Sequence, residues 1–177
     1  MAQGFTVIEK GVFDGTTAAV DFTSIPSTYS HLEISCTTNS DQSAANRASI
    51  SLTINGDTGS NYGYLGVAQS SGSGDLGYNM ATSSSAPLWM GNGPGDAVES
   101  GEMIGSLNMW FWNYADTTFH KTFYSSSGYA AGTTYVAMEQ GGIWRNTAAI
   151  NQVKLEVYSG GGEVWVSGCQ YMLGAWT

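Results

Sequence analysis

The stretch Leu32-Glu33-Ile34-Ser35-Cys36-Thr37 alternates apolar and polar residues without a break, and this pattern decides the fold class. Period-two alternation puts the apolar residues on one face of a β-strand and the polar residues on the other. The same alternation recurs at 50–54 and at 153–157. Each of the three segments therefore predicts a strand with one buried face.

Further strands are expected on both sides of these three, at 5–12, 17–22, 62–68, 103–112, 119–125, 134–138 and 164–176. No window repeats apolar residues with the 3.6-residue period of a helix. Asn55-Gly56, Asp14-Gly15 and 159–162 supply residues that tolerate positive φ between the strands. About ten strands joined by such turns predict an all-β fold, an antiparallel and jelly-roll-like β-sandwich.

The length of 177 residues suits one domain spanning 1–177. The segments 69–85 and 91–101 are rich in glycine, and the first also in serine. Because these residues disfavour strands, both segments are expected to form long surface loops.

Charged residues make up 11% of the chain, against roughly 25% in ordinary globular proteins. The formal net charge is −9, and the five basic residues are scattered along the sequence. Nucleic-acid binding needs a basic stripe that displaces counterions from phosphate, and anionic membranes attract basic segments. The charge pattern therefore argues against both kinds of partner.

The two cysteines, Cys36 and Cys169, stand one near each end of the sequence and would meet if the first and last strands were neighbours. The N-terminal residues show neither the basic region nor the apolar region of a signal peptide, so synthesis in a reducing cytoplasm is expected. Reduced, buried thiols are the expectation for such a compartment.

The pattern Gly72-Ser73-Gly74-Asp75-Leu76-Gly77 matches a dinucleotide-binding fingerprint by letter. The mechanism needs a buried strand before the glycines and a helix after them, and neither is expected here. His31 and His120 lack the partner spacing of a metal site and are expected at the surface, His31 beside Glu33.

The remaining catalytic patterns are equally weak. No serine sits in a nucleophile elbow, and Asp96, Glu99 and Glu102 lie in a glycine-rich segment, where a solvated acidic loop is the simpler interpretation. The sequence thus predicts a protein that is not an enzyme and holds no cofactor or metal.

The aromatic residues are the most ambiguous feature. Core packing is expected for Trp110, Phe111, Trp144 and Tyr171, and the strand ending at Trp112 is expected to become buried on both faces. The candidates for an interface are Trp89, Met90 and Trp176, which lie beside expected loops or the chain end.

Four stretches, taken in order, resemble a group of small β-sandwich virion proteins of tailed bacteriophages. They are 25–34, 54–62, 113–122 and 142–151, and the segment from Asn55 to Tyr62 is the most specific of them. The resemblance extends over most of the chain from about Ile8, and the region 69–101 departs from it. It implies a virion component and supplies no catalytic residues.

Three hypotheses follow. The leading one is a capsid decoration (cement) protein, homo-oligomeric, bound to the major capsid protein or other virion proteins and released with the virion. The alternative is a tail or head-fibre module that binds host-surface glycan through exposed aromatic and Asn/Asp groups. The third is a polysaccharide-degrading enzyme, which would need two carboxylates about 5 to 10 Å apart in a groove.

Overall fold

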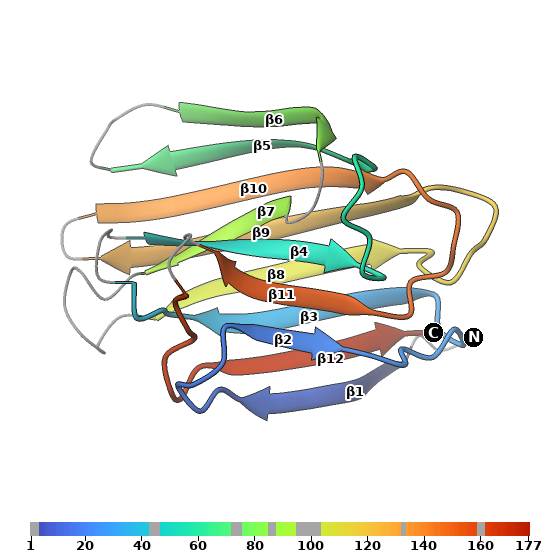
Figure 1. Ribbon diagram of the computed structural model, residues 1–177, viewed down its shortest axis with the longest axis horizontal. Helices are drawn as coiled ribbons and strands as arrows, with labels where there is room; N and C mark the ends of the chain where they lie inside the picture. The colour runs from blue at the N-terminus through green and yellow to red at the C-terminus, as the bar shows by residue number, and fades with distance from the viewer. Residues whose placement is uncertain are drawn as a thin grey trace.

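The computed structural model describes residues 4–42, 47–71, 76–84, 88–94, 104–131, 134–158 and 162–177. Twelve strands are found in these segments (Figure 1). Their bounds are β1 Phe5–Val12, β2 Ala19–Phe22, β3 His31–Thr38, β4 Arg47–Ile54, β5 Tyr62–Ser70, β6 Leu76–Ser84, β7 Leu88–Pro94, β8 Gly105–Trp112, β9 Lys121–Ala131, β10 Thr134–Trp144, β11 Val153–Tyr158 and β12 Gln170–Trp176.

The strands form two antiparallel sheets that pack face to face, which confirms the predicted all-β sandwich. The large sheet has eight strands in the order β1-β12-β3-β8-β9-β10-β5-β6. The small sheet has four strands in the order β2-β11-β4-β7 and lies in front of the large sheet in Figure 1. The chain passes repeatedly between the sheets, so β12 comes to lie between β1 and β3.

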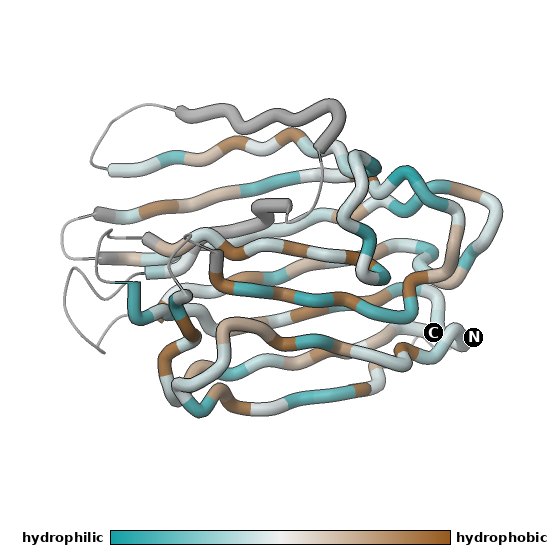
Figure 2. Tube along the Cα trace, viewed as in Figure 1, coloured by the Kyte–Doolittle hydropathy of each residue, from teal (hydrophilic) through white to brown (hydrophobic). Residues whose placement is uncertain are grey.

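The core lies between the sheets and is built by the alternation seen in the sequence. Along β3, buried and partly buried residues alternate strictly, with Leu32, Ile34 and Cys36 facing inward. Leu52 of β4 and Leu155 of β11 face them from the small sheet and are fully buried. Figure 2 shows this alternation of hydrophobic and hydrophilic residues along the strands.

The expectation of a long loop at 69–85 is wrong. β5 continues to Ser70, and β6 occupies 76–84 and pairs with β5, with Gln69 opposite Leu76. The ladder of backbone hydrogen bonds supplies the stability that Gly and Ser side chains do not, so sheet context overrides propensity.

The expected loop at 91–101 is partly wrong for the same reason. β7 runs to Pro94 and pairs with β4 at the edge of the small sheet, where proline is tolerated. Residues 95–101 lie outside the described part of the chain.

The turn at Asn55-Gly56 is confirmed: φ is 51° at Asn55 and 65° at Gly56, and the Asp57 N–H donates to the Ile54 carbonyl at 2.9 Å. The expected strand at 164–176 is shorter than predicted. A turn at Gly168, where φ is 95°, separates Trp165 from β12. Within the described ranges, no helix has the length and hydropathy needed to span a bilayer.

Candidate functional site

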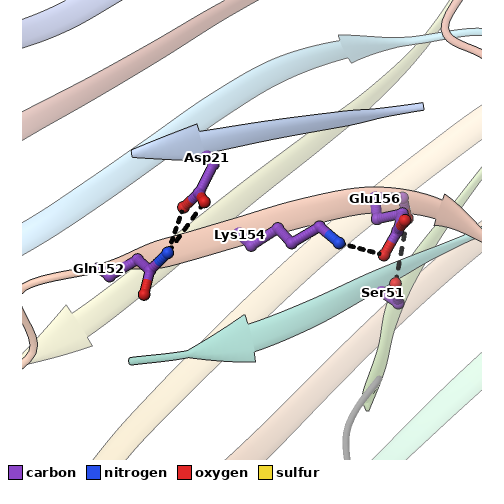
Figure 3. Close-up of polar contacts among 5 residues, drawn as sticks. All are labelled: Asp21, Ser51, Gln152, Lys154 and Glu156. Carbon is purple, nitrogen blue, oxygen red and sulfur yellow. Dashed lines mark hydrogen bonds and ion pairs between the residues drawn. The ribbon is translucent and has the colours of Figure 1, made fainter. Parts of the chain in front are cut away.

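The two outer faces of the sandwich differ in chemistry. The outer face of the small sheet is polar: Lys154 pairs with Glu156 at 2.8 Å, and both carboxylate oxygens of Asp21 accept from Gln152 Nε2 at 2.9 and 3.0 Å (Figure 3). The outer face of the large sheet, turned away from the small sheet, carries aromatic side chains instead. That face is the candidate functional site.

Strand register gathers five aromatic residues at one end of this face, and we call them the aromatic band. The members are Phe5, Trp110, Trp112, Tyr124 and Trp176. Phe5 stands opposite Trp176, and Trp176 is in one row with Trp112 through His31. Trp110 has the same parity as Trp112 on β8 and stands opposite Tyr124, so all five share one face of the sheet. Trp112 is 43% exposed and Phe5 39% exposed, while the other three are half-buried.

The β1 side of the band is held by contacts within the sheet. The rings of Phe5 and Trp176 lie 4.9 Å apart, tilted by 55°. Phe5 lies over Gly174, where a Cβ atom would come within 2.1 Å of its ring. The indole Nε1 of Trp176 donates to Glu33 Oε2 at 2.9 Å, so the only polar atom of that side chain is satisfied.

The β9 side of the band is held in a similar way. The rings of Trp110 and Tyr124 lie 5.7 Å apart. Burial raises the pKa of the Tyr124 hydroxyl, and a hydrogen bond to Glu139 together with the charge of that carboxylate raises it further. His31 stands between Trp176 and Trp112 in register, and its Nδ1 accepts from the Asn113 backbone N–H at 3.2 Å.

Aliphatic side chains flank the band on the same face. Val7 of β1 is 45% exposed on one side. On the other side, Leu65 of β5 stands in the same row as Trp110 and Tyr124, two strands beyond β9. Val67 follows it on the outer face. We call Val7, Leu65 and Val67 the aliphatic flanks.

Beside the band, one end of the sandwich is closed by three hydrogen-bonded loops, which we call the rim: 55–61, 113–120 and 145–152 (Figure 1). Asp57 is its centre. Its Oδ2 accepts from Trp144 Nε1 at 2.7 Å and from Asn61 Nδ2 at 2.8 Å, and its Oδ1 accepts from the Gly59 N–H at 2.8 Å. Burial acts to raise the pKa of Asp57, but these hydrogen bonds outweigh it and the pKa lies below the usual value.

Two further side chains join the loops of the rim. Asn55 donates to the Ala149 carbonyl at 2.8 Å and accepts from the Asn151 N–H at 2.9 Å. Lys121 is 1% exposed, and its ammonium group donates to the carbonyls of Asp116, Phe119 and Thr147. Desolvation lowers the pKa of Lys121, although the charge of Asp116 acts to raise it.

The rim or its immediate surroundings bring together the stretches 25–34, 54–62, 113–122 and 142–151. The Ile150 N–H donates to the Tyr114 carbonyl at 2.9 Å, and the Tyr114 hydroxyl donates to the Pro26 carbonyl. Their polar residues thus hold the fold together.

A cleft of about 350 Å³ lies between β1 and β2, at the open side of the sandwich. Glu9, Asp14 and Asp21 line it together with Phe13 and Tyr171. Hydrogen bonds from the Thr16 hydroxyl and N–H lower the pKa of Asp14. The acid of a glycosidase needs a raised pKa, so the shift of Asp14 runs against that role.

The residues singled out from the sequence fall in different places. Trp176 belongs to the aromatic band, whereas the side chains of Trp89 and Met90 lie outside the described part of the chain. The residues Asp96, Glu99 and Glu102 are also outside it. His120 is exposed, and His31 shares the outer face with Glu33, both as expected.

The expectation for the tryptophans of β8 is wrong. Phe111 is fully buried and Trp144 nearly so, as predicted, but Trp110 is half-buried and Trp112 is exposed, both on the outer face. The alternation with Met109 and Phe111 points both tryptophans outward, and this parity is the signal that would have found them.

Cys36 and Cys169 are both free and buried. No three His, Cys, Asp or Glu residues among those described lie close enough together to hold a metal ion.

Comparison with known proteins places the chain in no family: no family model matches the sequence, and no curated protein matches it. Among solved structures, a PL-14 alginate lyase from Aplysia kurodai is 8% identical, over 94% of this chain and 80% of that one, with a TM-score of 0.31. A Bacteroides ovatus protein of unknown function is 9% identical, over 74% of this chain and 46% of that one, with a TM-score of 0.21. An aerolysin-like protein from Bombina maxima is 8% identical, over 88% and 90% of the two chains, with a TM-score of 0.14. These scores are too low to support an argument about family or function.

Proposed function

We propose that this chain is a non-enzymatic structural protein of a tailed-phage virion, and specifically a capsid decoration protein that stabilises the shell. The observation that carries the proposal is the rim. Asp57, Asn55 and Lys121, which could serve chemistry elsewhere, are bonded to neighbouring loops and close the end of the sandwich. A sandwich end whose polar side chains are bonded to neighbouring loops suits a protein that works by attachment.

The aliphatic flanks support a role in lateral contact. Val7 and Leu65 lie on opposite sides of the outer face, toward the two lateral edges of the large sheet. Exposed aliphatic side chains contribute to protein interfaces by burial. Neighbouring capsid or decoration subunits that bury both flanks would stabilise the assembled shell by mass action, because they bind only the folded and assembled state.

Tagged-subunit imaging of intact virions with a copy-number count tests this proposal. Hundreds of copies spread over the icosahedral shell are expected, and a handful at the tail or at one vertex would contradict decoration. Particles that lack the protein should assemble and then lose their genome at a lower temperature than complete particles. Equal heat stability of the two kinds of particle would contradict the cement role.

A second candidate is a tail or head-fibre module that binds host-surface glycan. The aromatic band favours it, since the exposed Trp112 ring and the half-buried rings beside it on one sheet face suit the stacking of sugar rings. Binding of the purified chain to host cells, together with a low copy number at one site of the virion, would support this role over decoration.

A further inference from the structure

We infer that the aromatic band is a binding site for neutral glycan chains, with pyranose rings stacked on Trp112, Trp110 and Tyr124. The inference deepens the second proposed role, and it also holds for a decoration protein whose outer face points away from the shell. It rests on the shape, the fixation and the charge of the band, which are independent of where the protein sits in the virion.

The first argument is the placement of the rings. Trp112 and Trp176 stand in one row across the sheet with His31 between them, so two strand spacings, about 10 Å, separate their Cα atoms. Trp110 lies on the same face two residues before Trp112. The C–H face of a pyranose packs on an aromatic ring by burial of apolar surface. Ring sites spread over such distances suit several sugar units of one chain.

The second argument is that the rings are fixed before any ligand binds. The indole N–H of Trp176 donates to Glu33 Oε2 at 2.9 Å, and the rings of Trp110 and Tyr124 lie 5.7 Å apart. The polar atom of Trp176 is thus occupied and Trp110 is packed against Tyr124, while part of the Trp112 ring stays accessible. A ligand that stacks on rings already held in place loses less conformational entropy on binding.

The third argument is the uncharged polar border of the band. Thr122 stands opposite Trp112 on β9, and Asn108 precedes Trp110 on the same face of β8. Ser35 Oγ donates to Asn108 Oδ1 at 2.9 Å, which orients the amide. Hydroxyl and amide groups both donate and accept hydrogen bonds, as sugar hydroxyls require.

The fourth argument is charge, which selects the class of glycan. Glu33 and Glu139 are the carboxylates beside the band, and the formal net charge of the chain is −9. Sulfated, sialylated or uronic polymers would be repelled at this surface. A neutral hexose polymer meets no such repulsion.

The test is a titration of the full chain with neutral hexasaccharides of glucose and mannose, followed by tryptophan fluorescence and by calorimetry. At least one of them should bind with saturation, and oligogalacturonate should not. Trp112→Ala should weaken binding at least tenfold, equivalent to about 1.4 kcal/mol. Tyr135→Ala is the matched control, because Tyr135 is 61% exposed and lies outside the band; its affinity should stay within twofold of the wild type.

Circular dichroism and thermal unfolding of each variant show whether a loss of binding reflects a loss of fold, and Trp110→Phe provides a milder second variant. The inference is overturned if no neutral hexasaccharide binds at millimolar concentrations, or if folded Trp112→Ala binds like the wild type. It is also overturned if the band proves to be a self-association face, seen as a dimer that Trp112→Ala dissolves. Sugar binding by a protein that covers the shell would keep this inference and remove the fibre role; tail localisation without sugar binding would do the reverse.

Discussion

Asp57 shows how much of the rim depends on a single carboxylate. It accepts hydrogen bonds from an indole, an amide and a backbone N–H, and the indole belongs to Trp144, which is 1% exposed. Trp144 ends β10, so the carboxylate joins the loop after β4 to the large sheet. The contact therefore couples the two layers at the end where the candidate band lies.

Replacing Asp57 with Asn should lower the free energy of unfolding by about 2 kcal/mol at neutral pH, because hydrogen bonds to a charged acceptor are lost beside a buried donor. The pKa of Asp57 lies below 3.8 in the folded state, so its stabilisation is complete above that pH. It is lost as the pH falls through the folded-state pKa, and Asp57→Asn should flatten that part of the stability curve.

Urea denaturation at several pH values measures this effect. Asp21→Asn is the control, because Asp21 is exposed and bonds to the side chain of Gln152; its effect should stay within about 0.5 kcal/mol. An Asp57→Asn variant with the same free energy of unfolding as the wild type would show that the rim is held by its backbone contacts alone.

Lys121 marks a limit of sequence interpretation at this scale. A lysine next to an exposed histidine suggests a solvated pair, yet Lys121 is buried beneath three carbonyls. Lys121 lies two residues before Phe123 on β9, so both side chains point to the inner face. The three carbonyls around its ammonium group, however, come from two loops that meet only in the folded chain. A set of acceptors assembled in this way leaves no local pattern in the sequence.

Among the elements, β10 shows how side-chain volume is matched across strands. Gly142 faces inward, where an added Cβ would lie 2.1 Å from the ring of Phe123, whereas a Cβ on Gly141 would meet nothing within 4 Å. Glycine at 142 therefore makes room for the Phe123 ring, and glycine at 141 does not serve that purpose.

Gly142→Ala should lower the free energy of unfolding by about 1 to 3 kcal/mol, through overpacking against a buried ring. Gly141→Ala, one residue away on the same strand, should leave it unchanged or raise it slightly, since alanine loses less entropy than glycine on folding. Thermal unfolding of the two variants checks the contrast. Equal melting temperatures would mean that Phe123 moves aside at little cost.

How well an element could be predicted depended on whether its own residues carry the pattern. β3, β4 and β11 alternate apolar and polar residues, so their strands and buried faces follow from the sequence. β6 contains the polar and small residues of a loop and is a strand because β5 lies beside it.

The aromatic band was only partly predictable. The place of Trp176 near the chain end indicates an interface candidate. Hydrophobicity predicts burial for Trp110 and Trp112, whereas the alternation along β8 turns both to the outer face. Strand order decides that these residues share one face, and no local pattern encodes that β12 lies between β1 and β3.

At the scale of the whole molecule, the two thiols report on global unfolding. Cys36 and Cys169 are both in the core, and burial raises the pKa of each thiol, with the nearby Cys169 raising that of Cys36 further. Because the thiolate is the reactive form, neither should react with a disulfide reagent at pH 8 while the chain is folded.

Both thiols should react immediately when guanidinium chloride has unfolded the chain. At intermediate concentrations of guanidinium chloride, the labelled fraction should follow the loss of the circular dichroism signal. Rapid labelling of Cys169 alone in buffer would mean that the segment before β12 opens locally, without unfolding of the sandwich.

The pairing of the chain ends has a mechanical consequence. The Gly4 N–H donates to Thr177 Oγ1 at 3.0 Å and the Thr177 N–H to the Gly4 carbonyl at 3.2 Å, beside the antiparallel ladder of β1 and β12. A force that pulls Gly4 away from Thr177 would open that ladder one hydrogen bond at a time, as a zipper opens, and would not shear it. The sandwich should therefore unfold at a low force when it is pulled through Gly4 and Thr177. The unfolding force should be much higher when the two pulling points lie on different sheets.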